Sequence, residues 1–235
     1  VRDESEEKLK NLIELNILDY INITKIDMLN YPAVEQEIRI TNPNEIYNLA
    51  AQSSVGRSFI EPKETLEFNI NSVLHLLETI LKVNNKIRLY QASSSEIFGK
   101  TKDLPVHEND ALNPVSPYAT SKAAAHWMIK NYRDSFKLYV VSGILFNHES
   151  YLRKDNFFVK KVIKHSIEIS RGTRDILEVG NIDIKRDFGY SPLYIIAMWK
   201  MLQLETPEDF IICSGKSIYL RDIIYYCFDK LGVDY

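Results

Sequence analysis

The chain has 235 residues, of which 45% are hydrophobic and 26% are charged. This balance is typical of a globular protein with one sizeable core or two small ones. The net charge of −3 disfavours nucleic acid as a partner, and no apolar run is long enough to span a bilayer or to open the chain as a signal peptide. The two cysteines and five histidines lack metal-ligand spacing, so we expect no metal site and a reduced, cytoplasmic protein.

Helix and strand patterns alternate along the first part of the chain. Apolar alternation and β-branched runs predict strands at 20–26, 45–50, 87–93 and 138–146. Helical periodicity predicts helices at 6–18, 32–40, 62–83 and 117–136. Strands that alternate with helices favour an α/β fold with a doubly wound, Rossmann-type parallel sheet.

The pattern changes after residue 147, where we place a domain boundary. Here the sequence predicts helices at 156–170, 191–204 and 220–231, with short strands at 176–179 and 209–213. The helix at 156–170 is basic. Together with Arg153 and Arg186 it could be a solvated face or could bind an anion such as a diphosphate.

The strand at 87–93 runs into a cluster of hydroxyls and a carboxylate, with Ser94 and Glu96 at its centre. Ligands of open α/β sheets bind where the parallel strands end. Downstream, Ser116 is a good helix N-cap, and Pro117 suits the first helical position. Polar chemistry is therefore expected at this edge of the sheet, beside the start of the helix.

Tyr118 and Lys122 lie four residues apart, on one face of that helix. A free tyrosine has a pKa of about 10, and a nearby ammonium lowers it by favouring the phenolate. With a serine hydroxyl opposite, the set suits removal of a hydroxyl proton while hydride leaves the adjacent carbon. The same spacing recurs at Tyr226 and Lys230, without a serine-bearing strand before it, and we interpret that pair as surface and core patterning.

Five stretches together resemble one family. They are EIYNLAAQS (45–53), YQASSSE (90–96), SPYATSK (116–122), GILFNHES (143–150) and GNIDIKRD (180–187). They are similar to the GDP-mannose 4,6-dehydratase family, which belongs to the extended short-chain dehydrogenase/reductase superfamily. The resemblance covers nearly the whole chain, and the LFNHES run sets this family apart from related epimerases and dTDP-glucose dehydratases.

The resemblance implies a hydro-lyase, an NADP-dependent lyase with no net redox change. GDP-mannose would be oxidised at C4, lose water across C5 and C6, and regain hydride at C6 to give GDP-4-keto-6-deoxymannose, the precursor of GDP-fucose. Tyr118 would take the O4 proton and Glu96 the C5 proton. Ser94 stands where the family usually has threonine and would keep the hydroxyl's role, and Lys122 would lower the pKa of Tyr118 and hold the nicotinamide ribose.

The same resemblance implies two binding regions: a cofactor domain at 1–147 and a smaller substrate-binding region at 148–235. The cofactor residues would be Arg2, Asp27, Met28, Leu49, Ala50, Ala51, Gln52, Ser53, Tyr118, Lys122, His148 and Arg153. The substrate residues would be Asn147, Asn156, Lys161 and Arg186. Two alternatives stay open, because Asn147 could simply cap its strand and Asn156 could cap its helix. Family members are oligomeric, which implies a homodimer or homotetramer.

The sequence also departs from the family. The Gly-rich strand and turn with which the family begins, and its C-terminal part, have no counterpart here, so we expect a partial sequence of a longer chain rather than a relative that has lost dinucleotide binding. Asp3 stands where the family has a second arginine for the NADP 2′-phosphate, which leaves NAD as the alternative cofactor. Glu64 replaces a family tyrosine near the cofactor.

Two other functions compete with the dehydratase. One is another nucleotide-sugar enzyme of the superfamily, such as a 4-epimerase, which would need no base at the position of Glu96. The other is a non-catalytic homologue that serves as a binding or assembly module. The intact set of Ser94, Glu96, Tyr118 and Lys122 favours an enzyme.

Overall fold

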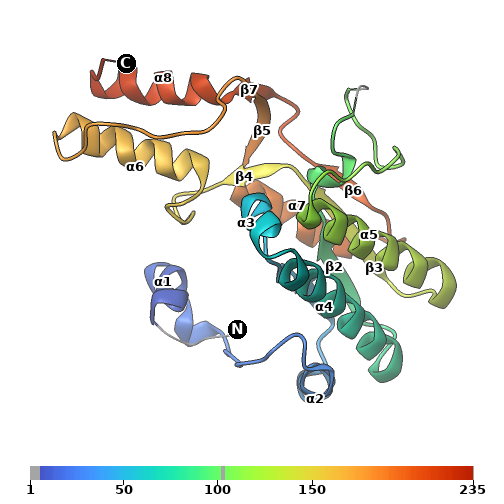
Figure 1. The fold of residues 1–235 in the computed structure, drawn as a ribbon. Coiled ribbons are helices and arrows are strands. Elements are labelled where there is room, and N and C mark those ends of the chain that lie inside the picture. The colour runs from blue at the N-terminus through green and yellow to red at the C-terminus, as the bar shows by residue number, and fades with distance from the viewer. Residues whose placement is uncertain (1–5, 102–103, 235) are drawn as a thin grey trace. The chain divides into compact units, whose positions relative to one another are not determined.

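The computed structural model describes residues 6–101 and 104–234, which divide into two compact units. The first unit contains residues 1–145 and 197–211, and the second contains residues 146–196 and 212–235. Each unit has its own sheet. We describe the two units separately (Figure 1).

The sheet of the first unit is the predicted α/β core. Its strands are β1 (Glu45–Asn48), β2 (Arg88–Ala92), β3 (Val140–Leu145) and β6 (Phe210–Ile212), in the order β1-β2-β3-β6. The β1–β2 and β2–β3 pairs are parallel. Because neighbouring parallel strands end at the same edge, the segments that follow β1 and β2 lie side by side.

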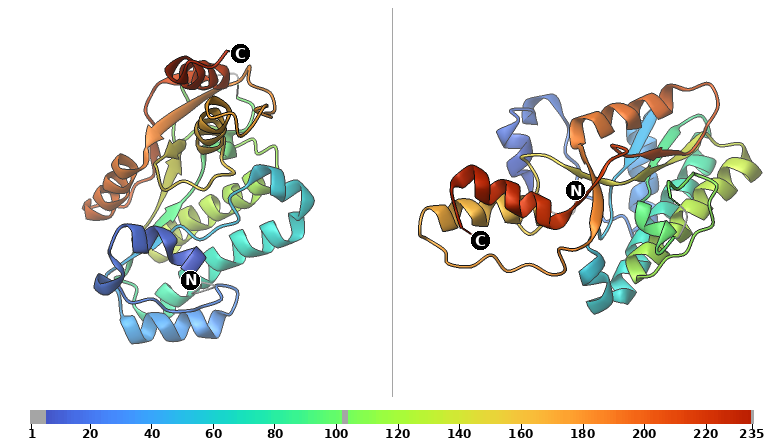
Figure 2. Two further views of the ribbon diagram at one scale, coloured as in Figure 1. Left: turned by 90° about the vertical axis from the view of Figure 1, so that its left-hand side faces the viewer. Right: turned by 90° about the horizontal axis from the view of Figure 1, so that it is seen from above.

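Helices cover both faces of this sheet. On one face, α2 (Tyr31–Thr41), α4 (Pro62–Val83) and α5 (Pro117–Phe136) pack with buried residues of the strands such as Leu89 and Val140. The opposite face carries the end of α7 (Ser191–Gln203), where Arg88, next to Leu89 in the strand, donates to the carbonyl of Leu202. Both sides of the sheet are therefore covered, as the doubly wound prediction requires. Figures 1 and 2 show α4 and α5 running side by side.

An ion pair links α5 to the segment that leads into β6, the edge strand of the sheet. Arg133 donates two hydrogen bonds of 2.7 Å to Asp209, whose Oδ1 also accepts the Ser142 backbone N–H at 2.6 Å. The pair is largely shielded from solvent and is bidentate, which is the strong geometry for arginine and carboxylate.

The second unit has a small sheet in the order β4-β5-β7, covered by helices. Its strands are β4 (Asn147–Glu149), β5 (Lys185–Tyr190) and β7 (Ser217–Tyr219), and its helices are α6 (Phe158–Ser170), α8 (Leu220–Leu231) and the first turns of α7. α6 and α8 run side by side (Figures 1 and 2) and bury Val162, Ile224 and Phe228 between them.

Two predicted strands are wrong. Residues 21–26 are irregular after a short 3₁₀ turn at Leu18–Tyr20, and no described strand pairs with them. Residues 176–179 are also unpaired, because Leu177 and Val179 pack on α6 and α8 while Ile176 faces solvent. In both places the apolar alternation of a strand occurs, but no strand in the described part of the chain pairs with it.

Other elements differ from the prediction or are missing from it. α1 (Glu6–Glu14) is shorter than expected, and α3 (Val55–Ile60) and the strands of the small sheet are additions. Ser54 caps α3 by accepting the Arg57 N–H at 3.2 Å. β5 was missed because it is charged and buries only Asp187 fully.

Gly143 is required where β3 passes the ring of Tyr90. A Cβ built on Gly143 would lie 2.1 Å from Tyr90 Oη and 2.6 Å from two ring carbons. Tyr90 is completely buried, so the ring has little room to move. We expect Gly143→Ala to lower the free energy of unfolding by about 1–3 kcal/mol, measured by urea denaturation.

Tyr90→Phe provides the control for this variant. Tyr90 Oη has no hydrogen-bond partner among the described residues, so its removal alone should be neutral or stabilising. In the double variant it should restore part of the loss. Equal stability of Gly143→Ala and wild type would contradict the packing argument.

Candidate active site

The end of β2 places Ser94 and Glu96 at the edge of the first unit's sheet. β2 ends at Ala92, and a 3₁₀ turn (Ser95–Phe98) follows. Ser94 caps this turn by accepting the Glu96 backbone N–H at 3.3 Å. The turn is anchored by Ile97 and Phe98, which are buried, so Ser94 and Glu96 have fixed backbone positions.

The start of α5 brings the Tyr118 and Lys122 pair to the same edge. Ser116 caps the helix by accepting the Ala119 N–H at 3.0 Å, and Pro117 is its first residue, as predicted. Lys122 Nζ donates to the carbonyl of Ala92 at 2.8 Å, which ties the helix directly to the end of β2. The same Nζ lies 5.9 Å from the centroid of the Tyr118 ring.

Lys122 is a buried cation that has no counter-ion among the described residues. Its side chain is 4% exposed, and no carboxylate in the described part of the chain forms an ion pair with it. Burial lowers the pKa of the Lys122 ammonium to about 8. At neutral pH the group therefore still carries a proton for most of the time, and its charge acts next to Tyr118.

The loop after β1 contains the predicted cofactor residues Leu49 to Ser53. Asn48 is opposite Gln91 in the sheet, so this loop is beside the serine cluster. Asn69 of α4 holds the loop by accepting the Gln52 N–H at 2.8 Å and donating to the Gln52 carbonyl at 3.0 Å. Leu49 is 54% exposed, so this stretch offers accessible backbone and side chains.

Asp27 and Met28 lie nearer α2. Asp27 is exposed and caps a turn by accepting the Leu29 N–H at 3.0 Å, and the Met28 carbonyl is 2.9 Å from Nδ1 of His75. Residues 25–33 and the first turns of α4 line a pocket of about 660 Å³ that includes Asp27 and the carboxylates of Glu64 and Glu67. Arg2, which was also predicted to bind the cofactor, lies outside the described residues.

The predicted residues of the second unit form two local clusters. Asn147 donates to the Asp187 carbonyl at 3.2 Å, and Nδ1 of His148 is 2.9 Å from the Phe146 carbonyl. Arg153 stacks 3.6 Å over the ring of Phe157. Desolvation lowers the pKa of His148, so the neutral imidazole is favoured at neutral pH.

The remaining substrate residues are more exposed. Asn156 does not cap α6, because the N-cap is Phe157, so that alternative interpretation of Asn156 is wrong. Arg186 is exposed and donates to the carbonyl of Lys185 at 3.2 Å. On α6, Lys164 pairs with Asp155 at 2.6 Å, whereas the Lys161 ammonium has no partner among the described residues.

Two buried contacts were missed in the sequence. Tyr194 packs its ring 4.8 Å from His148 and donates to the Asn147 carbonyl at 3.4 Å. The sequence feature that reflects this contact is Gly189, because a Cβ at that position would lie 2.2 Å from the Tyr194 ring. The other is the amide pair of Asn48 and Gln91, discussed below.

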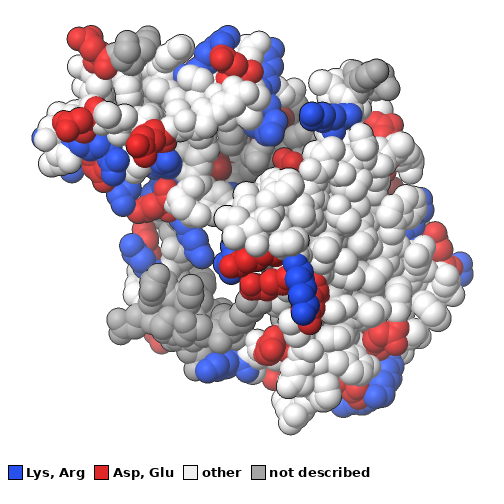
Figure 3. All heavy atoms as spheres, in the orientation of Figure 1, with Lys and Arg blue, Asp and Glu red and all other residues white. Residues whose placement is uncertain are grey.

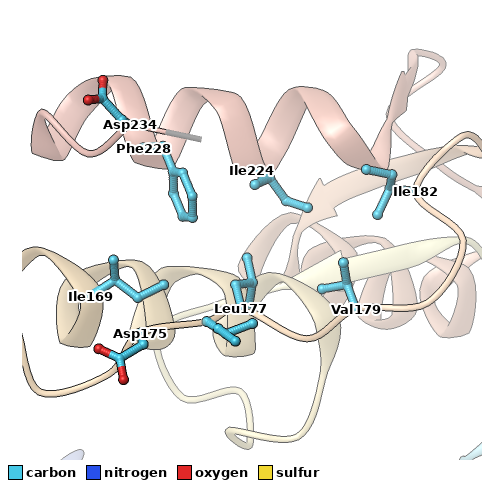
Figure 4. Close-up of a pocket in the computed structure, with 9 residues that line it drawn as sticks. Ile169, Asp175, Leu177, Val179, Ile182, Ile224, Phe228 and Asp234 are labelled. Atoms are coloured by element: carbon cyan, nitrogen blue, oxygen red, sulfur yellow. The ribbon is translucent and has the colours of Figure 1, made fainter.

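The second unit also contains an apolar pocket away from every predicted site residue. It measures about 360 Å³, and Ile224 and Phe228 of α8 face Leu177 and Val179 across it (Figure 4). Its lining belongs to the core of this unit, apart from the exposed Ile176 and two aspartates at one end. Polar groups that could orient a reacting molecule do not converge there.

On the face shown in Figure 3, basic and acidic side chains are interspersed rather than gathered by sign. Within the described ranges, no group of three or more His, Cys, Asp or Glu could hold a metal ion. No helix among those residues is long and apolar enough to cross a membrane.

The doubly wound sheet, with serine, tyrosine and lysine at its carboxyl edge, defines the short-chain dehydrogenase/reductase class. A family model described as GDP-mannose 4,6 dehydratase matches residues 1–235. The chain therefore belongs to the GDP-mannose 4,6-dehydratase family.

Individual relatives agree with this assignment. The chain is 41% identical over 194 residues to GDP-mannose 4,6 dehydratase of Dictyostelium discoideum, covering 82% of this chain and 54% of the relative. It is 39% identical over 220 residues to GDP-mannose 4,6-dehydratase of Yersinia enterocolitica, covering 92% and 58%. The chain thus spans little more than half the length of these relatives.

A solved structure shows the same fold. The structure of RMD from Pseudomonas aeruginosa, complexed with NADPH, superposes with a TM-score of 0.84 at 25% sequence identity. The match covers 96% of this chain and 79% of that one.

Proposed function

We propose that this chain carries the catalytic centre of a GDP-mannose 4,6-dehydratase. The observation that supports this most directly is the buried Lys122 ammonium, fixed on Ala92 between the end of β2 and Tyr118. Its positive charge would favour the phenolate of Tyr118 and so let the tyrosine act as a base closer to neutral pH. The first unit would hold a nicotinamide cofactor, and residues 148–235 would bind the sugar nucleotide.

The residues at the sheet edge fit such a cofactor. Ser93 Oγ is buried and has no hydrogen-bond partner among the described residues, and Lys122 lacks a counter-ion. Hydroxyls of a bound ribose could satisfy both groups. When bound, the nicotinamide would accept hydride from C4 of the sugar and return it to C6.

The chain's own residues would move the protons. Tyr118 would remove the proton from O4, with Lys122 stabilising its phenolate and Ser94 donating a hydrogen bond to the same oxygen. A ketone at C4 acidifies the hydrogen on C5. Glu96 would take that proton and pass it to the C6 hydroxyl, which would leave as water. This step distinguishes a dehydratase from a 4-epimerase.

The remaining binding residues are proposed from the family resemblance. The cofactor would lie along Asp27, Met28 and Leu49 to Ser53, with His148 and Arg153 also in contact. Asn147, Asn156, Lys161 and Arg186 would face GDP-mannose. NADP is the proposed cofactor and NAD the alternative, which competition binding of the two dinucleotides would decide.

We further propose a cytoplasmic homo-oligomer, a dimer or tetramer. Exposed apolar side chains on α3 and α5 support association, with Phe59 62%, Ile60 81% and Trp127 48% exposed. Light scattering after size-exclusion chromatography measures the number of subunits.

Glu96→Gln tests the reaction. The amide cannot accept the C5 proton, so dehydration, followed as loss of one water from GDP-mannose by mass spectrometry, should fall by about 10²–10⁴-fold. Oxidation at C4 should persist, seen as reduced nicotinamide absorbance in a single turnover. Glu205→Gln, at an exposed carboxylate, is the matched control and should keep wild-type turnover.

The alternatives give different results. Wild-type protein that converts GDP-mannose into an isomer of equal mass would indicate a 4-epimerase. Wild-type protein that neither turns over the sugar nucleotide nor binds a dinucleotide would indicate a binding module.

A further inference from the structure

Two buried amides connect the edge of the first unit's sheet to Lys122. Asn48 and Gln91, opposite each other in β1 and β2, are 4% and 1% exposed. Asn48 Nδ2 donates to Gln91 Oε1 at 2.7 Å, and Gln91 Nε2 donates to the Ala92 carbonyl at 3.0 Å. That carbonyl is the same acceptor that Lys122 uses at 2.8 Å.

The chain of hydrogen bonds also reaches the loop after β1. Asn48 Oδ1 accepts the Ala50 backbone N–H at 3.1 Å. In each amide the oxygen accepts one hydrogen bond and the nitrogen donates one, so the orientation of both side chains is defined. Turning the Gln91 amide around would set two oxygens against each other at Ala92 and two nitrogens against each other at Asn48.

We propose that Asn48 and Gln91 are positioning residues for Lys122, and that they hold its carbonyl acceptor at a fixed place relative to the loop that follows β1. This inference rests on the proposed function, since it assigns Lys122 a role in the reaction. The Ala92 carbonyl has two lone pairs, and Gln91 occupies one so that the other is left aimed at the ammonium.

The chemistry of this pair suits a neutral amide. A carboxylate in place of Gln91 would pair with the buried ammonium and favour its charged form more strongly. An apolar side chain would leave the Asn48 amide buried without its partner and the Ala92 carbonyl free to tilt. The first change would alter the pKa of the Lys122 ammonium and the second its position, although Lys122 itself is not substituted.

A merely structural pair would behave differently. Its loss would lower the free energy of unfolding at every pH and leave the pKa of Lys122 unchanged. The titration midpoint of Lys122 in the folded protein is the pH at which the stability of each protein, relative to its Lys122→Met counterpart, begins to rise. This readout does not depend on catalytic activity.

The variants are Gln91→Glu and Gln91→Met in the full chain. With Gln91→Glu, the midpoint for Lys122 should move upward by about one pH unit or more, because an opposite charge is introduced nearby. With Gln91→Met, kcat for GDP-mannose should fall by about 10- to 100-fold through misplacement of Lys122, with a smaller change in KM.

The matched control is a second amide pair in the same unit. Asn84 Nδ2 donates to Asn42 Oδ1 at 3.1 Å, between the ends of α4 and α2. Asn84→Leu should alter stability without moving the Lys122 midpoint or kcat.

An unchanged midpoint in Gln91→Glu together with unchanged kcat in Gln91→Met would overturn the proposal. If Gln91→Met does not fold, Asn48→Ser removes the amide that orients Gln91 and is judged by the same loss of kcat. If the wild type proves inactive, the proposed function fails, whereas a shifted midpoint in Gln91→Glu would still support the link to Lys122.

Discussion

Tyr118→Phe is expected to lower kcat for GDP-mannose by about 10²–10⁴-fold, because it removes the hydroxyl that would exchange a proton with O4 of the sugar. The phenyl ring should keep the buried position of the tyrosine ring at the start of α5, so the free energy of unfolding should change by less than about 1 kcal/mol. Steady-state turnover and urea denaturation measure the two quantities.

The chain supplies a matched control for this variant. On α8, Tyr226 and Lys230 have the same spacing, with Lys230 Nζ 5.6 Å from the Tyr226 ring centroid, against 5.9 Å for Lys122 and Tyr118. Tyr226 is 64% exposed, and Lys230 is exposed too. Tyr226→Phe should leave turnover unchanged. Retention of wild-type kcat by Tyr118→Phe would remove the tyrosine from the mechanism.

This pair of tyrosines shows how far the sequence could predict the site. Spacing alone places both lysines one helical turn after a tyrosine. The difference is the preceding segment. β2 runs into three consecutive serines before α5, whereas β7, directly before α8, has a single serine at its start, Ser217. That context predicted that the pair on α5 lies at the carboxyl edge of the first unit's sheet. The structure adds that Lys122 is buried while Lys230 is not.

The amide pair of Asn48 and Gln91 could not have been found in this way. Polar residues near strand ends are common, and nothing in the sequence says that they are opposite each other. Their meeting depends on the register of β1 and β2, which are separated by α3 and α4. Register is set by tertiary packing, so contacts of this kind appear only in the folded chain.

The fold was predicted best where apolar periodicity is strong and long. α4 and α5 begin and end at the predicted residues because proline starts each helix and their apolar faces are well defined. The short strands of the second unit failed this test. β4 and β7 have only three residues each, too few to show a period.

Lys122→Met should abolish most of the turnover and yet make the protein more stable at pH 7. The wild-type ammonium is buried, and its pKa is lowered from 10.5 to about 8. At about 1.4 kcal/mol for each pKa unit, keeping it charged in the folded state costs roughly 3 kcal/mol. Methionine has a similar length and no charge, and the Ala92 carbonyl keeps its hydrogen bond from Gln91.

The stability difference between Lys122→Met and the wild type depends on pH, because the pKa of Lys122 is lower in the folded protein than in the unfolded chain. Below about pH 8 the lysine is protonated in both states, so the wild type carries the full penalty. Between about pH 8 and 10.5 the unfolded chain holds a proton that the folded protein has released, so wild-type stability rises with pH. The advantage of Lys122→Met, about 1–3 kcal/mol at pH 7, should shrink over this range.

Urea denaturation from pH 7 to pH 10 measures the difference, with Lys230→Met as the exposed control that should change little. A less stable Lys122→Met at pH 7 would mean that the ammonium is a net structural contact. The expected result, a more stable Lys122→Met, would mean that the lysine lowers the stability of the protein. Groups that serve a reaction are often held in such unfavourable surroundings. In that case the charge next to Tyr118 would be kept because the proton transfer needs it.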